Sequence, residues 1–201
     1  MEQLVSEHPA GQSIVALSEH RDWRHPLWLA LLVAASVLFS LGLACAVPLA
    51  AFASAAALSL SRRDALMLIV LVWLANQLVG FTLLGYPWDA STFAWGAVLG
   101  VVAILATLAS RWIAGRFAKA RRAFTATATF LAAFAVYEAA LFAVSATMLG
   151  GTEIYTLAIQ GRVFAINAAA FVGLLALHRL ASSVGLVNRP AVVRSTVEQH
   201  A

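Results

Sequence analysis

The chain has 201 residues, of which 62% are hydrophobic and 11% are charged, and its mean hydropathy is +0.88. A soluble domain carries about 25% charged residues, so this composition excludes a soluble globular protein and indicates an integral membrane protein. The apolar runs are continuous rather than alternating, which excludes a β-barrel and predicts an all-α bundle. The net charge of +4 is typical of basic cytoplasmic loops and does not predict nucleic-acid binding.

The chain divides into a tail, a membrane domain and a second tail. Residues 1–25 are polar, lack the apolar core of a signal peptide, and are expected to form a cytoplasmic tail. Residues 26–186 form the transmembrane domain, and residues 187–201 form a polar C-terminal tail. Six spans are predicted in this domain, at residues 27–44, 49–61, 66–84, 93–110, 124–149 and 152–186.

The second predicted span is short. It has about 13 residues, whereas a perpendicular crossing needs about 20, so we expect it to be tilted or to belong to a bent hairpin. Pro48 is its expected first helical residue. The basic run Arg62-Arg63-Asp64 is expected to form the turn before span three, and residues 85–92 the turn after it.

The basic residues test the span count. Twelve of the thirteen Lys and Arg residues fall on one side of the six-span arrangement, and Arg162, inside the last span, is the exception. By the positive-inside rule this distribution predicts that both termini are cytoplasmic.

Polar side chains from three spans are predicted to lie in the outer half of the membrane. At 1.5 Å per residue, Asn76 and Gln77 lie about 11–12 Å from the outer end of their span, Glu138 about 16 Å and Asn167 about 20 Å. Adjacent amides in an apolar helix are costly unless they meet a partner, a cavity or a ligand. We therefore expect Asn76, Gln77, Gln160 and Asn167 to line one substrate-binding cavity.

The turn after span three is expected to cover this cavity with Tyr86, Trp88 and Asp89. Arg162 points about 160–200° away from Gln160 on its helix. It is expected to pair with Glu138 between spans five and six, as a structural or a functional ion pair. The alternative is that the amides only join helices and that the aromatic residues only mark the membrane interface.

The remaining candidates for chemistry are few. Cys45 is the single cysteine and cannot form an internal disulfide, and the five histidines lie in tails or at helix ends without metal-binding spacing. The sequence has no nucleotide-binding motif and no nucleophile elbow. We therefore expect neither an enzyme nor an ATPase.

The segment VPLAAFASAAALSLSRRDALMLIVLVWLANQLVGF, residues 47–81, resembles the S components of energy-coupling factor (ECF) vitamin transporters. In that family a proline-led short span, a basic turn and a long span follow one another, and six helices bind a vitamin or a metal at the outer side. In length and topology the resemblance extends over residues 26–186. It implies a substrate-binding subunit of the bacterial inner membrane, with a coupling subunit and ATPases as possible partners. Ala30 and Ala34 match the Ala-x-x-x-Ala face that docks on the coupling subunit.

Within this family the chain is most similar to the solitary cobalamin-binding group (BtuM). That group uses a cysteine as a cobalt ligand, which implies that Cys45 binds the cobalt of a cobalamin. The cobalamin would be the substrate, and the chain would have no cofactor of its own. The alternative function is a non-transport membrane scaffold or assembly subunit, in which the polar residues serve only helix packing.

Overall fold

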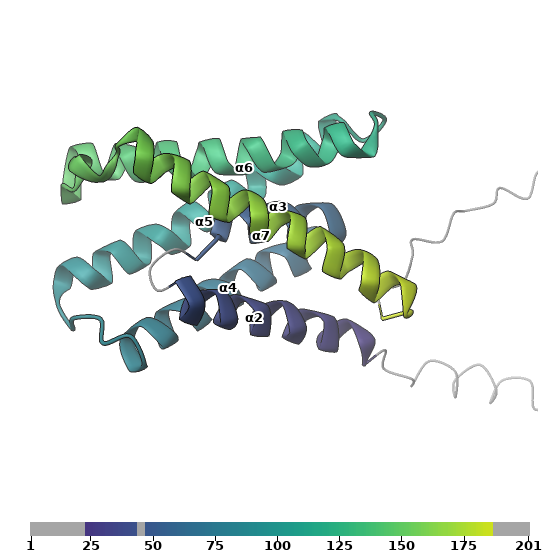
Figure 1. Cartoon of the computed structure of the whole chain (residues 1–201), viewed down its shortest axis with the longest axis horizontal. Coiled ribbons are helices and arrows are strands. Elements are labelled where there is room, and N and C mark those ends of the chain that lie inside the picture. Colours follow the sequence, from purple (N-terminus) through teal and green to yellow (C-terminus); the bar gives the residue numbers. More distant parts are fainter. Residues whose placement is uncertain (1–22, 44–46, 187–201) are drawn as a thin grey trace, which may run out of the picture.

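The computed structural model describes residues 23–43 and 47–186, so the two predicted tails and Cys45 lie outside the described residues. All secondary structure in the described chain is helical, as predicted, and the helices form one bundle (Figure 1). The helices are α2 (Arg24–Leu43), α3 (Leu49–Ser59), α4 (Arg62–Thr82), α5 (Ala90–Arg116), α6 (Arg122–Val144) and α7 (Leu157–Ser183). A π-helical turn (Ser145–Leu149) continues α6, and a 3₁₀ turn (Thr152–Ile154) precedes α7.

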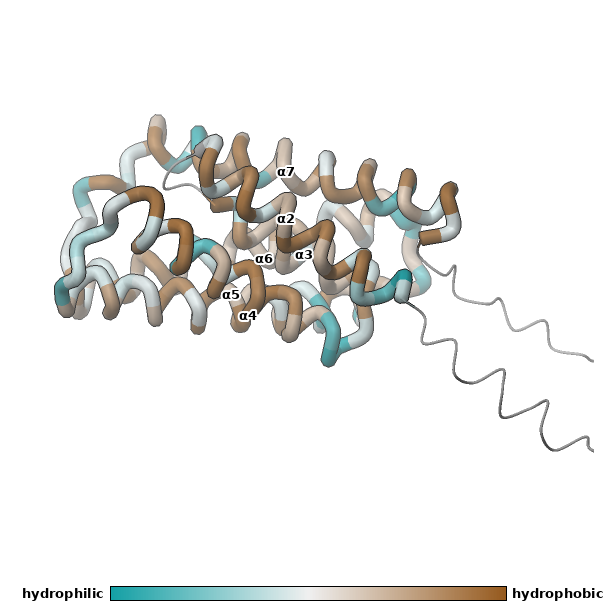
Figure 2. The backbone as a smooth tube through the Cα atoms, turned by 90° about the horizontal axis from the view of Figure 1, so that it is seen from below, coloured by the Kyte–Doolittle hydropathy of each residue, from teal (hydrophilic) through white to brown (hydrophobic). Residues whose placement is uncertain are grey.

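Five of these helices are long and apolar enough to cross a membrane, and α3 is the exception. Figure 2 shows an apolar body between hydrophilic ends, as expected for a multi-pass membrane protein. With 11 residues, α3 is about 16 Å long, roughly half of a hydrocarbon core. The predicted second span is therefore a half-length helix.

The two ends of the bundle differ in charge. The beginning of α2 and the end of α7 lie at the same end, together with the α3–α4 turn and the α5–α6 loop (Figure 1). We call this the basic end, and the opposite end, with the loops at residues 83–89 and 150–156, the loop end. Nine described basic residues belong to the basic end: Arg24, Arg62, Arg63, Arg111, Arg116, Lys119, Arg121, Arg122 and Arg179.

Helix α3 forms the centre of the bundle. It packs against α4, α5, α6 and α7, and eight of its eleven residues are buried. Most of these residues are alanines, whose small side chains favour helix and let the surrounding helices approach closely. Pro48 is the N-cap of this helix rather than its first helical residue, because its ψ of 64° is not helical.

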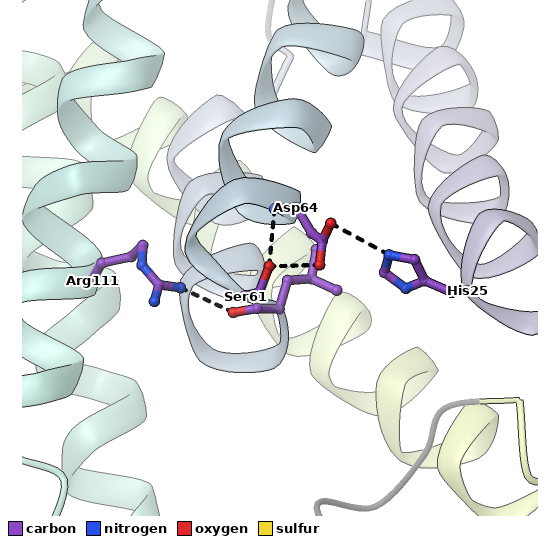
Figure 3. Close-up of polar contacts among 5 residues, drawn as sticks. His25, Ser61, Asp64 and Arg111 are labelled. Carbon is purple, nitrogen blue, oxygen red and sulfur yellow. Dashed lines mark hydrogen bonds and ion pairs between the residues drawn. The ribbon is translucent and has the colours of Figure 1, made fainter. Parts of the chain in front are cut away.

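Side chains from other helices hold the α3–α4 turn (Figure 3). The Arg111 guanidinium of α5 donates to the Leu60 carbonyl at 2.9 Å, which satisfies an acceptor at the end of α3. Ser61 accepts from the Asp64 N–H at 3.2 Å and donates to its carboxylate at 2.6 Å. His25 Nε2 of α2 lies 3.5 Å from the same carboxylate. The turn is therefore at residues 60–61, and the predicted turn at residues 62–64 is wrong because Ser61 caps α4.

Two glycines of α5 set its distance from α4. The Trp73 indole N–H donates to the Gly96 carbonyl at 2.8 Å, and the Trp73 ring lies over Gly100. A Cβ at Gly100 would be 2.8 Å from this ring. The glycines thus leave room for large α4 side chains on the α5 backbone.

Candidate functional site

The two amides predicted to share a cavity on α4 have separate packing roles. Asn76 is buried, and its Oδ1 accepts from the Ser40 hydroxyl of α2 at 3.4 Å. The Gln77 amide lies against Gly96 of α5, where a Cβ would be 2.6 Å from its Oε1. Consecutive helix residues point about 100° apart, so the two side chains face different neighbours. Asn76 therefore joins α4 to α2, and Gln77 joins α4 to α5.

Asn167 supports the central helix. Its Oδ1 accepts from the Ala51 N–H at 3.3 Å, and its amide nitrogen donates to the Val163 carbonyl at 3.0 Å. Ala51 is the third residue of α3, so its N–H has no acceptor within the helix. Asn167 therefore supplies, from α7, a side-chain acceptor for a free N–H at the beginning of α3, and its oxygen is already engaged.

The α4–α5 loop joins its two helices. The Phe81 ring lies 6.0 Å from Tyr86, 5.1 Å from Trp88 and 4.9 Å from Phe93, measured between ring centroids. Asp89 is the N-cap of α5 and accepts from the Thr92 N–H at 2.7 Å.

This hydrogen bond from the Thr92 backbone lowers the pKa of Asp89. The three predicted lid residues Tyr86, Trp88 and Asp89 thus lie where α4 meets α5. The Tyr86 and Trp88 rings pack on Phe81 of α4, and Asp89 caps α5. These contacts do not include Gln160 or Asn167, so the shared, covered cavity stays a prediction.

The predicted pair of Glu138 with Arg162 is not formed among the described residues, where the one ion pair joins His25 and Asp64. Glu138 is half-buried on α6, whereas Arg162 is exposed on α7. Helix α7 begins at Leu157, later than predicted, so Arg162 lies only about 8 Å into the helix. A long arginine side chain at this depth can reach the polar interface.

Polar residues gather instead where α6 and α7 meet at the loop end. Tyr155, just before α7, packs its ring against Phe142 of α6 at 5.0 Å. Burial raises the pKa of Tyr155, and the negative charge of Glu138 raises it further. Glu138 and Ser145 lie about one helical turn before and after Phe142, the residue that Tyr155 contacts, and Ser145 Oγ is buried without a hydrogen-bond partner among the described residues.

Gln160, one turn into α7, adds an amide at the same end of the bundle, and its Oε1 is buried without a hydrogen-bond partner in the described part of the chain. We call Glu138, Ser145, Tyr155 and Gln160 the seam site. It includes Ser145, the first residue of the π-helical turn Ser145–Leu149, and such turns are frequent at functional sites. Glu138 and Gln160 are predicted site residues, whereas Ser145 and Tyr155 are not. No periodic pattern in the sequence marks Ser145 or Tyr155 as site residues. The only nearby signal is Gly150-Gly151, which indicates where α6 ends.

The remaining predicted residues are the docking alanines of α2 and the single cysteine. Ala30 and Ala34 are exposed on α2, as a docking face requires. Cys45, the predicted cobalt ligand, lies outside the described residues. Within residues 23–43 and 47–186, no three His, Cys, Asp or Glu side chains are grouped to hold a metal ion.

Comparison of the chain with family models, with curated proteins and with solved structures finds no match.

Proposed function

We propose that this protein is the substrate-binding subunit of a micronutrient uptake system, related in design to the ECF S components, and that it captures a small molecule at the seam site. The observation that carries the proposal is the set of polar groups in this otherwise apolar seam. Glu138 is half-buried without a cation partner among the described residues, and the Gln160 oxygen is buried without a donor. Ionisable and polar groups within a membrane are costly, and they commonly mark ligand or ion sites.

The charge asymmetry supports an orientation for this function. Nine described basic residues lie at the basic end, and Arg162 is the only described one nearer the loop end. The positive-inside rule then assigns the basic end to the cytoplasm and the seam site to the periplasmic side of a bacterial inner membrane. The seam site would thus face the side from which a nutrient arrives.

The helix packing supports a route of entry. Helix α7 packs chiefly on α3, and its contact with α6 is small. Phenylalanines contribute to that contact: the Phe130 and Phe171 rings are stacked with centroids 5.0 Å apart, and the Phe134 and Phe164 rings meet edge to face at 5.1 Å. Separating α6 from α7 at the loop end would therefore break few contacts while α3 keeps the bundle together.

Cobalamin is the ligand to test first, because the resemblance of residues 47–81 implies it. Mass spectrometry of small molecules released from the purified protein, followed by titration with cyanocobalamin, tests the proposal.

Glu138→Gln and Gln160→Leu should each weaken binding about tenfold, the effect of losing one hydrogen bond of about 1.4 kcal/mol. Gln77→Leu is the matched control and should bind normally, since Gln77 lies against Gly96. A Cys45→Ser variant with an unchanged cobalamin spectrum would remove the cobalt ligand but not the seam site.

A non-transport scaffold is the second candidate function, and specific contacts favour it. Asn76 and Asn167 are both engaged in bonds between helices. If no small molecule copurifies, and the seam variants differ from the wild-type protein only in thermal stability, the scaffold function replaces the uptake function. We propose that uptake uses a coupling subunit that docks on the exposed Ala30 and Ala34 of α2. Replacing both with Trp should abolish uptake and leave binding intact.

A further inference from the structure

A second polar feature, independent of the seam site, lies nearer the basic end. A cavity of about 40 Å³ is enclosed by α2, α3, α4 and α7. A buried water needs about 10–15 Å³ measured in this way, so the cavity holds about three. Its walls are mostly apolar and include Leu32, Phe52, Leu68 and Leu174, together with Trp28 and His178.

Two ring nitrogens at this cavity have no hydrogen-bond partner among the described residues. Trp28 is only 2% exposed, and its indole Nε1 is one of them. The other is Nδ1 of His178, whose ring centroid lies 5.7 Å from that of Trp28. Ser59, the remaining polar residue of the lining, already donates its hydroxyl to the Ala55 carbonyl at 2.6 Å. A buried N–H without an acceptor is costly, so this donor points to an occupant.

The cavity lies where α2 meets α7, so a molecule bound in it can join these two helices. Helix α2 packs along α4, whereas α7 packs along α3, and the Trp28–His178 pair joins α2 to α7. We infer that the cavity binds a hydroxyl oxygen that accepts from the Trp28 N–H and hydrogen-bonds to His178 Nδ1, and that this bridge fastens α2 to α7. The oxygen comes from water or from the headgroup of a hydroxyl-bearing lipid, since both can offer a donor and an acceptor in so small a space.

A double-mutant cycle on the full chain in lipid nanodiscs tests the bridge. Trp28→Phe and His178→Phe should each lower the thermal midpoint by about 2–4 °C, and the double variant should lose less than the sum, because both partners of one bridge are then gone. If the cavity is empty, each substitution changes only the local packing and no shared oxygen couples the two residues, so the two effects add. That result overturns the inference. Trp112→Phe is the control, since this tryptophan is 69% exposed, and it should leave the midpoint unchanged.

The lipid composition separates the two sources of the oxygen. Coupling between the two variants that is equal in phosphatidylcholine and in phosphatidylglycerol discs identifies water, because only the second headgroup carries free hydroxyls. Coupling in phosphatidylglycerol alone identifies the lipid, and coupling in neither overturns the inference. If Trp28→Phe does not fold, the wild-type protein labelled with ¹⁵N-tryptophan gives the same answer. The Trp28 indole N–H should show a magnetisation-transfer signal to water or to the headgroup, and its absence from both refutes the bridge.

Discussion

Asn167→Leu should destabilise the bundle through the central helix. The substitution keeps the approximate size of the side chain and removes the oxygen that accepts from the Ala51 N–H at 3.3 Å. Ala51 is fully buried, so water cannot replace this acceptor. Leaving a buried donor unsatisfied costs about 1–3 kcal/mol, and the loss of a side-chain acceptor at the beginning of a helix costs about 1 kcal/mol. The two free-energy costs describe the loss of the same hydrogen bond, so they are not added.

The assay is the thermal midpoint of the purified protein at a fixed scan rate. For a chain of this size, about 1–3 kcal/mol corresponds to a decrease of about 2–12 °C. Gln160→Leu is the matched control, because this amide lies on the same helix and its oxygen has no partner in the described chain. We expect the midpoint of the control to stay the same or rise. An Asn167→Leu protein with an unchanged midpoint and weakened ligand binding would refute the cap and return Asn167 to the binding site.

Two further predictions test the helix packing and the orientation. Gly100→Ala should cost about 1–3 kcal/mol because its Cβ would lie 2.8 Å from the Trp73 ring, whereas Gly115→Ala, with nothing within 4 Å, should be neutral or slightly stabilising in urea or thermal denaturation. Equal effects of the two substitutions would contradict the close approach of α4 and α5. A single cysteine at Thr152 in a Cys45→Ser background should react with an impermeant reagent applied to the periplasmic side, and one at Lys119 should not; the reverse pattern would invert the assigned orientation.

The helical class and most of the helix positions could be predicted, because long apolar runs in a charge-poor chain leave the backbone few choices. The boundaries were less predictable. The sequence predicts a turn at residues 62–64, whereas α4 already begins at Arg62, because Ser61 and Asp64 form a local cap around the two arginines. The sequence predicts the last span from residue 152, whereas α7 begins at Leu157, because a 3₁₀ turn occupies residues 152–154.

The site was harder to predict than the fold, for geometric reasons. Asn76 and Gln77 were assigned to one cavity by depth, but their directions differ and depth alone does not reveal it. Asn167 meets Ala51 across 116 positions of sequence, a contact that no local pattern encodes. Only Glu138 and Gln160 of the predicted residues lie in the seam site, and both were found because polar groups are rare in these spans.

The dependence of α3 on a distant cap has a consequence for how the protein is made. The α3 segment leaves the ribosome before α7 exists, and the residue that accepts from its Ala51 N–H follows 116 positions later. At about 5–20 residues per second, this interval lasts on the order of ten seconds. A helix of about 16 Å cannot span the bilayer during that time. Until α7 is made, the central helix can pack on α4, α5 and α6, but its Ala51 N–H lacks the acceptor that completes it.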